Sequence, residues 1–379
     1  MTDPLLAPTD PLLALPGAVA GDPPDELVPA HHGDPLAEQR SMARRAAVVD
    51  RGNREVIAVP GEERLKWLHL ILSQHVSELA DGAGTEALVL DVNGRVQHHM
   101  VVSHVGDTVW LDTEPGTAAA LLDYMRSMVF WSKVDPRDAT AELAVLSVVG
   151  PTALSVLEAA GVKVPGTEYG SAALPGGGLV RRMPSLAPSG STHAVDLLVP
   201  RADLVDWWMR LRKAGAAAAG TMAYEALRVA AMRPRLGRDT DEKTIPHEVG
   251  WIPTAVHLAK GCYRGQETVA RVANLGRPPR RLVMLHTDSG DAEMPAPGDP
   301  VVLAGRTVGR VGSAVLHHEL GGVALALVKR SVPLDAELIA GDEDRVTAVR
   351  IDPDSITDDD AAERPGRAAQ LRAGLIRPS

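Results

Sequence analysis

Two adjacent prolines, Pro278 and Pro279, divide the chain into parts with different hydrophobic patterns. Proline donates no backbone N–H and restricts the residue before it, so a pair of prolines ends regular structure. Short aliphatic runs separated by Gly and Pro follow the pair, at residues 282–286, 300–303, 307–316 and 323–329. Strands at this spacing predict a small β-barrel domain over residues 278–351.

Helical and strand-like patterns alternate without a fixed order in residues 36–277. The Asn93-Gly94 pair between two strand-like runs predicts a hairpin, because both residues tolerate positive φ. Further strand-like runs are at 55–59, 108–112, 143–149 and 194–199, and helical patterns are at 117–128, 200–211 and 222–231. This mixed order predicts the α+β class.

The two ends of the chain lack hydrophobic periodicity. Residues 1–35 are rich in Pro, Asp and Ala, and residues 352–379 contain three successive aspartates followed by Arg, Ala and Pro. Segments of this kind bury too little apolar surface to offset the entropy of ordering. We therefore expect a flexible N-terminal arm and a disordered C-terminal tail.

Charge and cysteine content exclude several classes of function. The net charge of −10 and the pI of about 5.7 argue against nucleic-acid partners and against anionic membranes. No apolar run is long enough to span a bilayer and no Lys or Arg precedes Arg40, so we expect neither a membrane span nor export. The single cysteine, Cys262, excludes an internal disulfide and favours a cytoplasmic setting. The pairs His31-His32 and His317-His318 have no second ligand cluster at metal spacing, so no metal site is expected.

The cysteine lies at the end of a long stretch, residues 232–260, with few helix or strand signals. The octapeptide that follows is Lys260-Gly261-Cys262-Tyr263-Arg264-Gly265-Gln266-Glu267. Its two glycines permit tight turns, and the cations Lys260, Arg264 and Arg271 favour a thiolate. A helix beginning near Gln266 adds to this effect, whereas Glu267 opposes it unless an arginine pairs with it. The alternative is that Cys262 is a small core residue beside a turn, with the charges solvated.

The octapeptide, with Ala270-Arg271 and Gly276 after it, resembles the signature of the folate-binding YgfZ-like proteins of the aminomethyltransferase fold. The resemblance extends from about residue 40 to about residue 350. It includes Glu225-Ala226-Leu227-Arg228, Arg235-Leu236-Gly237 and Pro246-His247-Glu248, which are similar to a stretch of the glycine-cleavage T-proteins. It implies three lobes around a central folate channel, with two interwoven α+β lobes in residues 36–277 and the β-barrel as the third.

The resemblance also implies roles for individual residues. Residues 194–200 resemble the family strand whose acid holds the pterin, which makes Asp196 the pterin partner; a carboxylate can accept two hydrogen bonds from the pterin amino and ring N–H groups. The alternative for Asp196 is an acid at a strand edge facing water. Trp110 falls near the family's ligand-side aromatic but is equally compatible with a core position. The expected folate-binding set is Asp196, Arg228, Tyr263, Arg271 and Trp110, and the expected working thiol is Cys262, supported by Lys260, Arg264, Gln266 and Glu267.

One departure from the aminomethyltransferase pattern affects the expected chemistry. Those enzymes carry a Gly-x-x-x-Asp-Asp motif after the first hairpin, whereas this chain has His98 and His99 in place of both acids. An imidazole cannot supply the same carboxylate chemistry. Alternation along a strand would also direct the two side chains to opposite faces.

The resemblance implies a tetrahydrofolate-binding accessory protein that supports iron–sulfur cluster assembly or repair in client enzymes, with which it would associate transiently. A single cysteine cannot hold a stable cluster by itself, so the thiol would hold iron only in passing. One alternative is a folate-dependent aminomethyl or other one-carbon transferase, against which the histidine pair counts. Another is a folate sensor without catalysis, whose folate binding would be indifferent to Cys262.

Overall fold

The computed structural model describes residues 10–187, 190–252, 254–288, 294–342 and 345–356. The chain forms two compact units. Unit 1 takes in the residues up to Ile71, His75–Ala87 and His98–Ala231, and unit 2 takes in Leu72–Gln74, Leu88–Gln97 and the residues from Met232 onward. Residues 232–277 thus belong with the barrel strands, although the sequence patterns place a boundary at residue 278.

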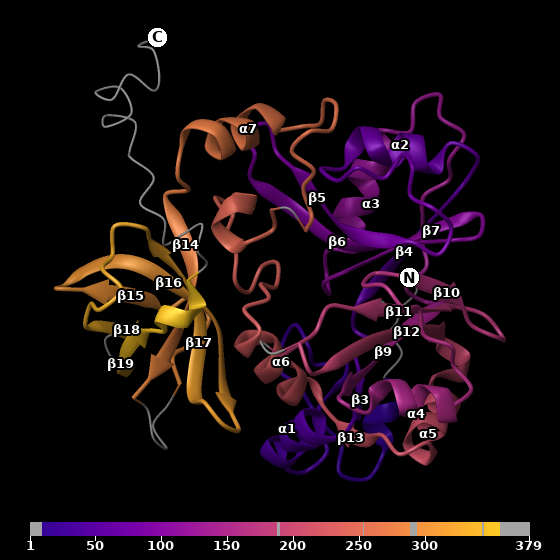
Figure 1. The fold of residues 1–379 in the computed structure, drawn as a ribbon, viewed down its shortest axis with the longest axis horizontal. Coiled ribbons are helices and arrows are strands. Elements are labelled where there is room, and N and C mark those ends of the chain that lie inside the picture. Colours follow the sequence, from indigo (N-terminus) through magenta and orange to yellow (C-terminus); the bar gives the residue numbers. More distant parts are fainter. Residues whose placement is uncertain (1–9, 188–189, 253, 289–293, 343–344, 357–379) are drawn as a thin grey trace, which may run out of the picture. The chain divides into compact units, whose positions relative to one another are not determined.

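Unit 1 is built around a six-stranded sheet with the order β10-β11-β12-β9-β3-β13 (Figure 1). The pairs β10–β11, β11–β12, β12–β9 and β9–β3 are antiparallel, and β13 joins β3 in parallel. The strands are β3 Ala47–Asp50, β9 Leu143–Gly150, β10 Ser171–Ala173, β11 Leu179–Met183, β12 His193–Pro200 and β13 Ala217–Ala219. Strands β10 and β11 lie within residues 166–190, a glycine-rich stretch whose sequence predicts a loop.

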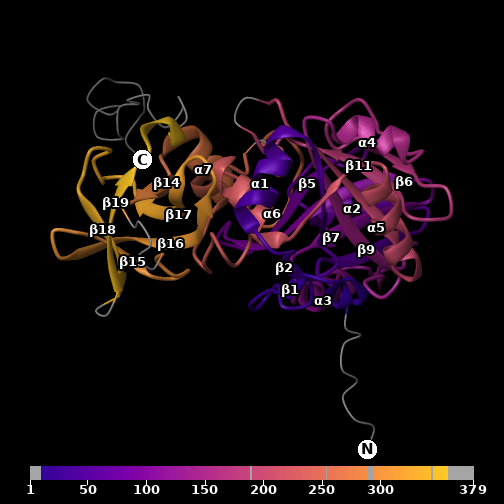
Figure 2. The same ribbon diagram turned by 90° about the horizontal axis from the view of Figure 1, so that it is seen from below.

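Helices cover both faces of this sheet, because its central strands are apolar on both sides. Helices α4 and α5 pack with Val48, Leu146 and Val148, whereas α1 and α6 pack with the alternate positions Val49 and Val149. Figure 2 shows α1 and α6 together, apart from α4 and α5. The helices are α1 Pro35–Arg44, α4 Ala153–Ala159, α5 Leu204–Lys213, preceded by the 3-10 turn η2 Arg201–Asp203, and α6 Thr221–Ala230.

A second sheet of unit 1 has the order β5-β6-β7-β4-β8. Its strands are β4 Glu55–Pro60, β5 Gly84–Leu90, β6 Val96–Val105, β7 Thr108–Thr113 and β8 Arg137–Asp138, and its helices are α2 Arg64–Ile71 and α3 Ala118–Ser127. An apolar cluster joins this sheet to the first, with Val56 and Ala58 of β4 against Val145 of β9 and Leu198 of β12. Both sheets therefore share a core, and polar groups between them are removed from water.

The described part of the expected N-terminal arm is folded. The 3-10 turn η1 Pro11–Ala14 precedes the strand pair β1 Val19–Ala20 and β2 Pro29–His31. Leu12 and Val28 are fully buried, and the Glu38 carboxylate accepts hydrogen bonds from the backbone N–H of His32 at 2.7 Å and of Gly220 at 2.9 Å. The expectation of a flexible arm is therefore wrong for residues 10–34, because apolar burial and a buried acceptor fix the segment. The expectation of a disordered tail is likewise wrong for residues 352–356, because Asp352 lies 3.1 Å from His286 and the Ser355 hydroxyl accepts a hydrogen bond from the backbone N–H of Met284 at 3.1 Å. Residues 1–9 and 357–379 lie outside the described residues.

Unit 2 contains a closed barrel of six strands in the order β14-β17-β16-β15-β18-β19. The strands are β14 Arg280–Thr287, β15 Pro300–Leu303, β16 Arg306–His317, β17 Gly321–Lys329, β18 Leu338–Asp342 and β19 Arg345–Ile351, followed by the 3-10 turn η4 Pro353–Ser355. Alternate positions of β14 and β17, such as Val283, Leu285 and Ala326, fill its interior. The sequence patterns identify the first four strands and miss β18 and β19.

The stretch before the barrel is fastened to it by polar contacts. The Asp239 carboxylate accepts hydrogen bonds from the backbone N–H of Ser313 at 2.7 Å and of Arg235 at 2.8 Å. The Arg280 guanidinium pairs with Asp241 at 2.6 Å and with Glu248 at 2.8 Å. These contacts explain how a segment with little regular structure, apart from the 3-10 turn η3 Pro246–Val249 and helix α7 Gln266–Leu275, takes a fixed path.

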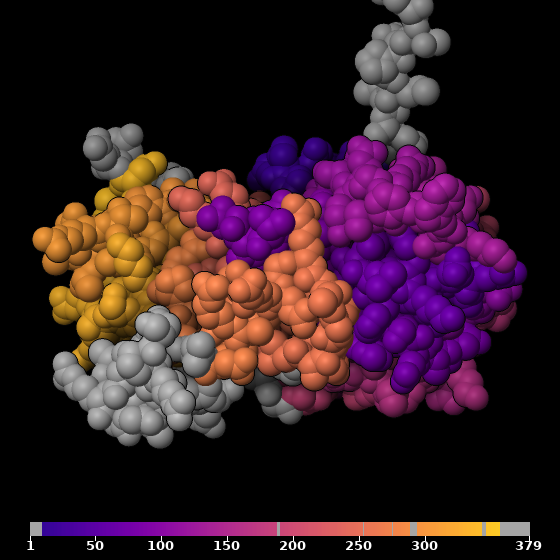
Figure 3. Space-filling model, turned by 90° about the horizontal axis from the view of Figure 1, so that it is seen from above, coloured from indigo at the N-terminus to yellow at the C-terminus, as the bar shows by residue number. Residues whose placement is uncertain are grey.

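The tip of the β5–β6 hairpin also belongs to unit 2. Gly94 has φ 77°, and the Asp91 carboxylate accepts hydrogen bonds from the backbone N–H of Asn93 and of Arg95, both at 2.8 Å. The backbone N–H of Val96 donates to the Thr244 carbonyl at 2.8 Å. Figure 3 shows the purple surface of this tip set among the orange residues that precede the barrel. The hairpin that the Asn-Gly pair predicts is therefore present.

Candidate functional site

The cysteine loop spans the residues between Lys260 and helix α7. Gly265 precedes the helix with φ 81°, and a Cβ at this position would lie 2.5 Å from the Asp91 carbonyl oxygen and 2.8 Å from Gly94 Cα. Only glycine fits here, because the backbone is left-handed and the hairpin tip lies against it. At Gly261 the φ angle is not positive, and a Cβ would meet no described atom within 4 Å, so the space beside this glycine is open.

The motif residues divide into a buried and an exposed set. Lys260 is buried, and its ammonium donates to the Leu72 carbonyl at 2.5 Å. The Gln266 side-chain amide donates to the Lys260 carbonyl at 3.0 Å and closes the loop. Tyr263 is buried, whereas Cys262 is exposed. The interpretation of Cys262 as a core residue is therefore wrong, since its neighbours fill the interior and the thiol faces solvent.

Burial changes the acid–base behaviour of two loop residues. It lowers the pKa of Lys260 to about 8 and raises the pKa of Tyr263 to about 12. The ammonium of Lys260 lies 5.2 Å from the centre of the Tyr263 ring, which adds a cation–π contact to its carbonyl partners. The positive charge of Lys260 is thus held by groups inside unit 2.

The two arginines of the motif region are on the surface. Arg264 is exposed, and Arg271 pairs with Glu267 at 3.7 Å, one helical turn apart on α7. Both members of this pair are largely exposed, so the pair adds little stability. The pair does mean that an arginine offsets the charge of Glu267, which would otherwise oppose formation of a thiolate at Cys262.

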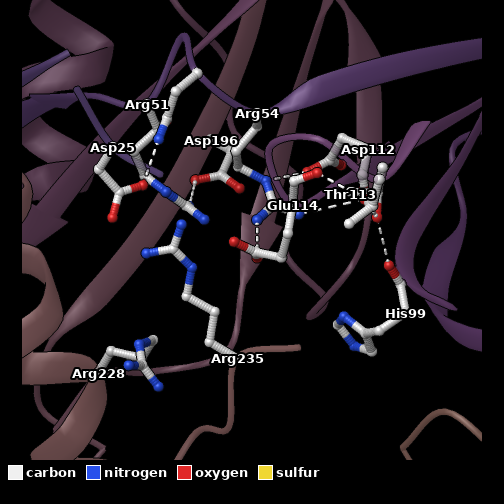
Figure 4. A network of polar contacts seen from close by, with 12 residues as sticks. Asp25, Arg51, Arg54, His99, Asp112, Thr113, Glu114, Asp196, Arg228 and Arg235 are labelled. Carbon is white, nitrogen blue, oxygen red and sulfur yellow. Dashed lines mark hydrogen bonds and ion pairs between the residues drawn. The ribbon is translucent and has the colours of Figure 1, made fainter. Parts of the chain in front are cut away.

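A chain of buried ion pairs lies between the two sheets of unit 1. Arg181 of β11 pairs with Asp112 of β7 and with Asp196 of β12, the second at 2.8 Å, and all three side chains are almost fully buried. Arg54 donates to Asp112 at 2.6 Å and pairs with Glu114 (Figure 4). Each buried charge in this chain has an opposite partner, which is the condition for keeping charges in an apolar interior.

Strand register places the Asp196 carboxylate. Arg181, Asp196 and Ser147 lie opposite one another on β11, β12 and β9. The Ser147 hydroxyl donates to Asp196 Oδ1 at 2.6 Å, while Arg181 donates to Oδ2 through Nε at 3.3 Å and Nη2 at 2.8 Å. Burial alone raises the pKa of Asp196, but the charges of Arg181 and Arg51 outweigh it and hold the pKa below its usual value.

This geometry limits what Asp196 can bind. A carboxylate has about four acceptor positions, and both positions on Oδ2 are taken by Arg181. One position remains on Oδ1 beside Ser147, with Arg51 Nη1 3.5 Å away. The alternative of a strand-edge acid facing water is wrong, since Asp196 is 1% exposed. The expected pair of hydrogen bonds to a pterin would require Arg181 or Ser147 to move.

Arg51 and Arg228 contribute guanidinium groups to unit 1, the first half-buried and the second buried. Arg51 donates to the Tyr224 hydroxyl at 2.9 Å and lies over the Tyr224 ring at 4.2 Å. Arg228 of α6 makes a paired contact with Glu225 through Nε at 2.9 Å and Nη2 at 2.8 Å, with 7% of its side chain exposed. Guanidinium groups of this kind suit carboxylate ligands.

The remaining predicted residues lie on the second sheet. Trp110 of β7 is half-buried and packs against the apolar cluster between the sheets, as the core alternative predicts. Burial lowers the pKa of His98 to about 4. His99 lies 3.2 Å from Glu86, whose carboxylate also accepts from the Tyr169 hydroxyl at 2.5 Å. Cys262, Tyr263 and Arg271 belong to unit 2, whereas Trp110, Asp196 and Arg228 belong to unit 1.

Several residues of this network are missed by sequence reasoning. Arg181 lies in the glycine-rich stretch whose sequence predicts a loop, and nothing in the sequence of β7 indicates that the acid Asp112 is itself buried. A charged residue flanked by apolar neighbours, as in Ala194–Val199 around Asp196, is the one signal available. It identifies an acid that needs a partner without identifying the partner.

Comparison with known proteins assigns the family. A family model described as the GCVT N-terminal domain matches residues 30–260, more than half of the chain. The chain belongs to the GCVT family. A second model, the CAF17 C-terminal beta-barrel domain, matches residues 280–353. These two domains in this order confirm the YgfZ-type resemblance inferred from the cysteine motif.

A solved structure confirms the fold of this GCVT-family protein. The glycine cleavage system aminomethyltransferase T from Bartonella henselae is similar with a TM-score of 0.77, at 19% identity, over 90% of this chain and 94% of that chain. The fold is therefore the α+β T-protein-like fold with a C-terminal β-barrel.

Curated relatives are more distant in sequence. A chloroplastic candidate transferase of Arabidopsis thaliana is 26% identical over 274 residues, which span 70% of this chain and 61% of that protein. The aminomethyltransferase of Symbiobacterium thermophilum is 25% identical over 315 residues, 79% of this chain and 83% of that protein. The chain thus spans about three fifths of the length of the Arabidopsis relative.

Membrane-spanning helices and metal clusters are both missing from the described ranges of this GCVT-family protein. None of the helices in those ranges has the length and apolar character needed to cross a bilayer. Within the same ranges, no three His, Cys, Asp or Glu side chains gather in a way that could hold a metal ion.

Proposed function

We propose that this GCVT-family protein binds tetrahydrofolate through unit 1 and supports iron–sulfur cluster assembly or repair in client enzymes through Cys262. The observation that carries the proposal is the division of the motif. The loop is held by the buried side chains of Lys260 and Tyr263 and by the hydrogen bond of Gln266, whereas the Cys262 thiol is exposed. A loop built in this way presents a reactive group to a partner molecule.

Polar groups of unit 1 support folate binding. Tetrahydrofolate offers N–H donors at its pterin end and carboxylates at its glutamate end. Asp196 has an acceptor position left on Oδ1, and Arg51 and Arg228 offer guanidinium groups for a carboxylate. When bound, the folate would supply its capacity to carry a one-carbon unit. The roles of Trp110, Tyr263 and Arg271 toward folate remain part of the proposal.

Cys262 acts on clients rather than on a resident cluster. A cluster needs several thiolate ligands, and this chain has one cysteine. The thiol would therefore hold iron or sulfur only while a client supplies the remaining ligands. Arg264, exposed beside it, offers a positive charge toward the same partner.

Titration calorimetry with tetrahydrofolate tests the folate part. We expect binding by the full chain and a loss of at least about tenfold in affinity in Asp196→Asn, because the amide cannot replace a charged acceptor. Asp203→Asn, an exposed acid just after β12, serves as the matched control. Folded wild-type protein that binds no folate would contradict this part.

Client activity in cells tests the thiol part. Cells that depend on this protein should lose iron–sulfur enzyme activity when they carry Cys262→Ser, and keep it with Leu258→Ser, an exposed substitution in the same segment. Unchanged client activity in Cys262→Ser would exclude the thiol as the working group. Folate binding should be the same in both variants, which separates the two parts of the proposal.

A one-carbon transferase is the second candidate, favoured by aminomethyltransferase relatives such as that of Symbiobacterium thermophilum. The two histidines count against it. His98 is neutral at pH 7, since its pKa is about 4, and His99 is engaged with Glu86. Turnover of an aminomethyl donor with tetrahydrofolate by purified protein would establish this candidate, and its absence in a sensitive assay would remove it.

A further inference from the structure

Two carboxyl groups meet in the interior of unit 1, away from the network around Asp196. Asp50 ends β3 and is fully buried, and Asp10 precedes η1 and is 5% exposed. A Cβ on Gly52 would lie 3.0 Å from Asp50 Oδ1 and 3.1 Å from Asp10 Oδ2, so the two carboxyls flank one point beside this glycine. Burying two like charges this close is strongly unfavourable.

In each of the two carboxyl groups, one oxygen accepts a backbone hydrogen bond and the other does not. Asp10 Oδ1 accepts from the backbone N–H of Leu12 and Asp50 Oδ1 from that of Gly52, each at 2.8 Å. Oδ2 of both groups is buried and accepts no hydrogen bond from the described residues. Two carboxylates have no donor to offer each other, whereas a carboxylic acid and a carboxylate do.

We propose that Asp10 and Asp50 share one proton, and that this proton fastens the N-terminal segment of unit 1 to the turn that carries Arg51 and Arg54. With one proton, the pair carries a single negative charge. Arg201 is the cation that acts on both groups; it donates to the Gly52 carbonyl at 2.9 Å and balances that charge. Burial followed by the charge of Asp10 raises the pKa of Asp50 well above its ordinary value, and burial raises the pKa of Asp10.

The position of the pair links it to the buried network. Arg51 follows Asp50 directly in the chain and donates to Ser147 at 3.2 Å, beside Asp196. Asn53 of the same turn donates to Asp25 of the N-terminal segment at 2.6 Å. Loss of the shared proton would set two buried carboxylates against each other. The repulsion would weaken both the packing of η1 against unit 1 and the turn that positions Arg51.

The direction of the pH effect follows from the raised pKa values. A carboxyl whose pKa is raised by folding binds its proton more tightly in the folded chain. The stability of the segment is therefore present at low pH and lost as pH rises from the ordinary aspartate value toward the raised value. This is opposite to the effect of the ion-paired aspartates of the network.

Hydrogen exchange of the full chain at a series of pH values tests the proposal. Asp50→Asn keeps the shape, and its amide donates to Asp10 as the shared proton does. At the most alkaline pH of the series, and after correction for the intrinsic rate, we expect the Leu12 and Gly52 amides to exchange about tenfold faster in wild-type protein than in Asp50→Asn. Asp22→Asn, an exposed acid in the same segment, should follow wild type.

The possible results separate a shared proton from a bound cation. Identical pH curves for wild type and Asp50→Asn would overturn the proposal. Protection lost on adding a chelator, or on replacing sodium by a large organic cation, would overturn it in favour of a bound cation. If Asp50→Asn does not fold, Asp10→Asn at the edge of the unit gives the same test. None of these readouts depends on folate or on client enzymes.

Discussion

At the scale of single residues, Arg181 links the two sheets of unit 1 through buried ion pairs. It pairs with Asp112 in one sheet and Asp196 in the other, and all three are almost fully buried. A buried charge is tolerated only while its partner remains. Any folate-dependent role of Asp196 therefore rests on Arg181, which holds the carboxylate in place and ionised.

Replacing Arg181 with leucine should lower the free energy of unfolding by about 3–5 kcal/mol, because two buried carboxylates lose their cation. Denaturant unfolding measures the change. Arg182→Leu, on the opposite face of β11 with a partly exposed side chain, should cost less than about 1 kcal/mol. Equal losses in the two variants would show that the ion pairs do not matter. Adding Asp112→Asn and Asp196→Asn to Arg181→Leu should restore part of the loss.

The exposure of Cys262 gives a second prediction at this scale. Since the chain has one cysteine, a thiol reagent reports on this residue alone. We expect one equivalent to react in the native protein at a rate within about tenfold of the denatured chain, because the thiol faces solvent. A thiol that reacts only after unfolding would contradict the position of the loop.

At the scale of elements, the cysteine loop is defined by how α7 meets the β5–β6 hairpin. The helix can begin where it does because Gly265 takes φ 81° and leaves room for the Asp91 carbonyl. The two glycines of the motif, equivalent in the sequence, therefore have different roles. One is required by the contact with the hairpin tip, and the other leaves its surroundings open.

Gly265→Ala should destabilise unit 2 by about 1–3 kcal/mol, because alanine meets both a positive φ and a backbone contact. Gly261→Ala should change stability by less than about 0.5 kcal/mol. Thermal unfolding and hydrogen exchange of α7 measure the difference. If the two substitutions act alike, the hairpin does not constrain the loop.

At the scale of the whole molecule, two sets of carboxyls give opposite pH dependence. Burial raises the pKa of Asp241, but hydrogen bonds from Arg280 and Thr244 outweigh it and lower the pKa to about 2. The pKa of Asp196 is also lowered, so both aspartates contribute stability at neutral pH that is lost on acidification. Asp10, Asp50 and Glu38, with raised pKa values, lose their contribution as pH rises.

The unfolding temperature of wild-type protein should therefore pass through a maximum at mildly acidic pH, between about 4 and about 7. Asp50→Asn should flatten the alkaline side, and Arg280→Gln should flatten the acid side. Calorimetric scans across this range measure both. A monotonic rise to neutral pH in wild type would mean that the raised carboxyls contribute nothing.

The sequence by itself determined the elements whose signals are local. The Asn93-Gly94 turn, the apolar strands around Asp196 and the first four barrel strands all follow from side-chain periodicity and turn chemistry, and the octapeptide around Cys262 predicted the family. The tertiary structure decided the rest. It buried Leu12 and folded the expected arm, showed that Lys260 is held inside, and brought Arg181 to Asp112 and Asp196 across two sheets. Pairings of this kind depend on strand register and sheet packing between residues far apart in the chain, which no local pattern encodes.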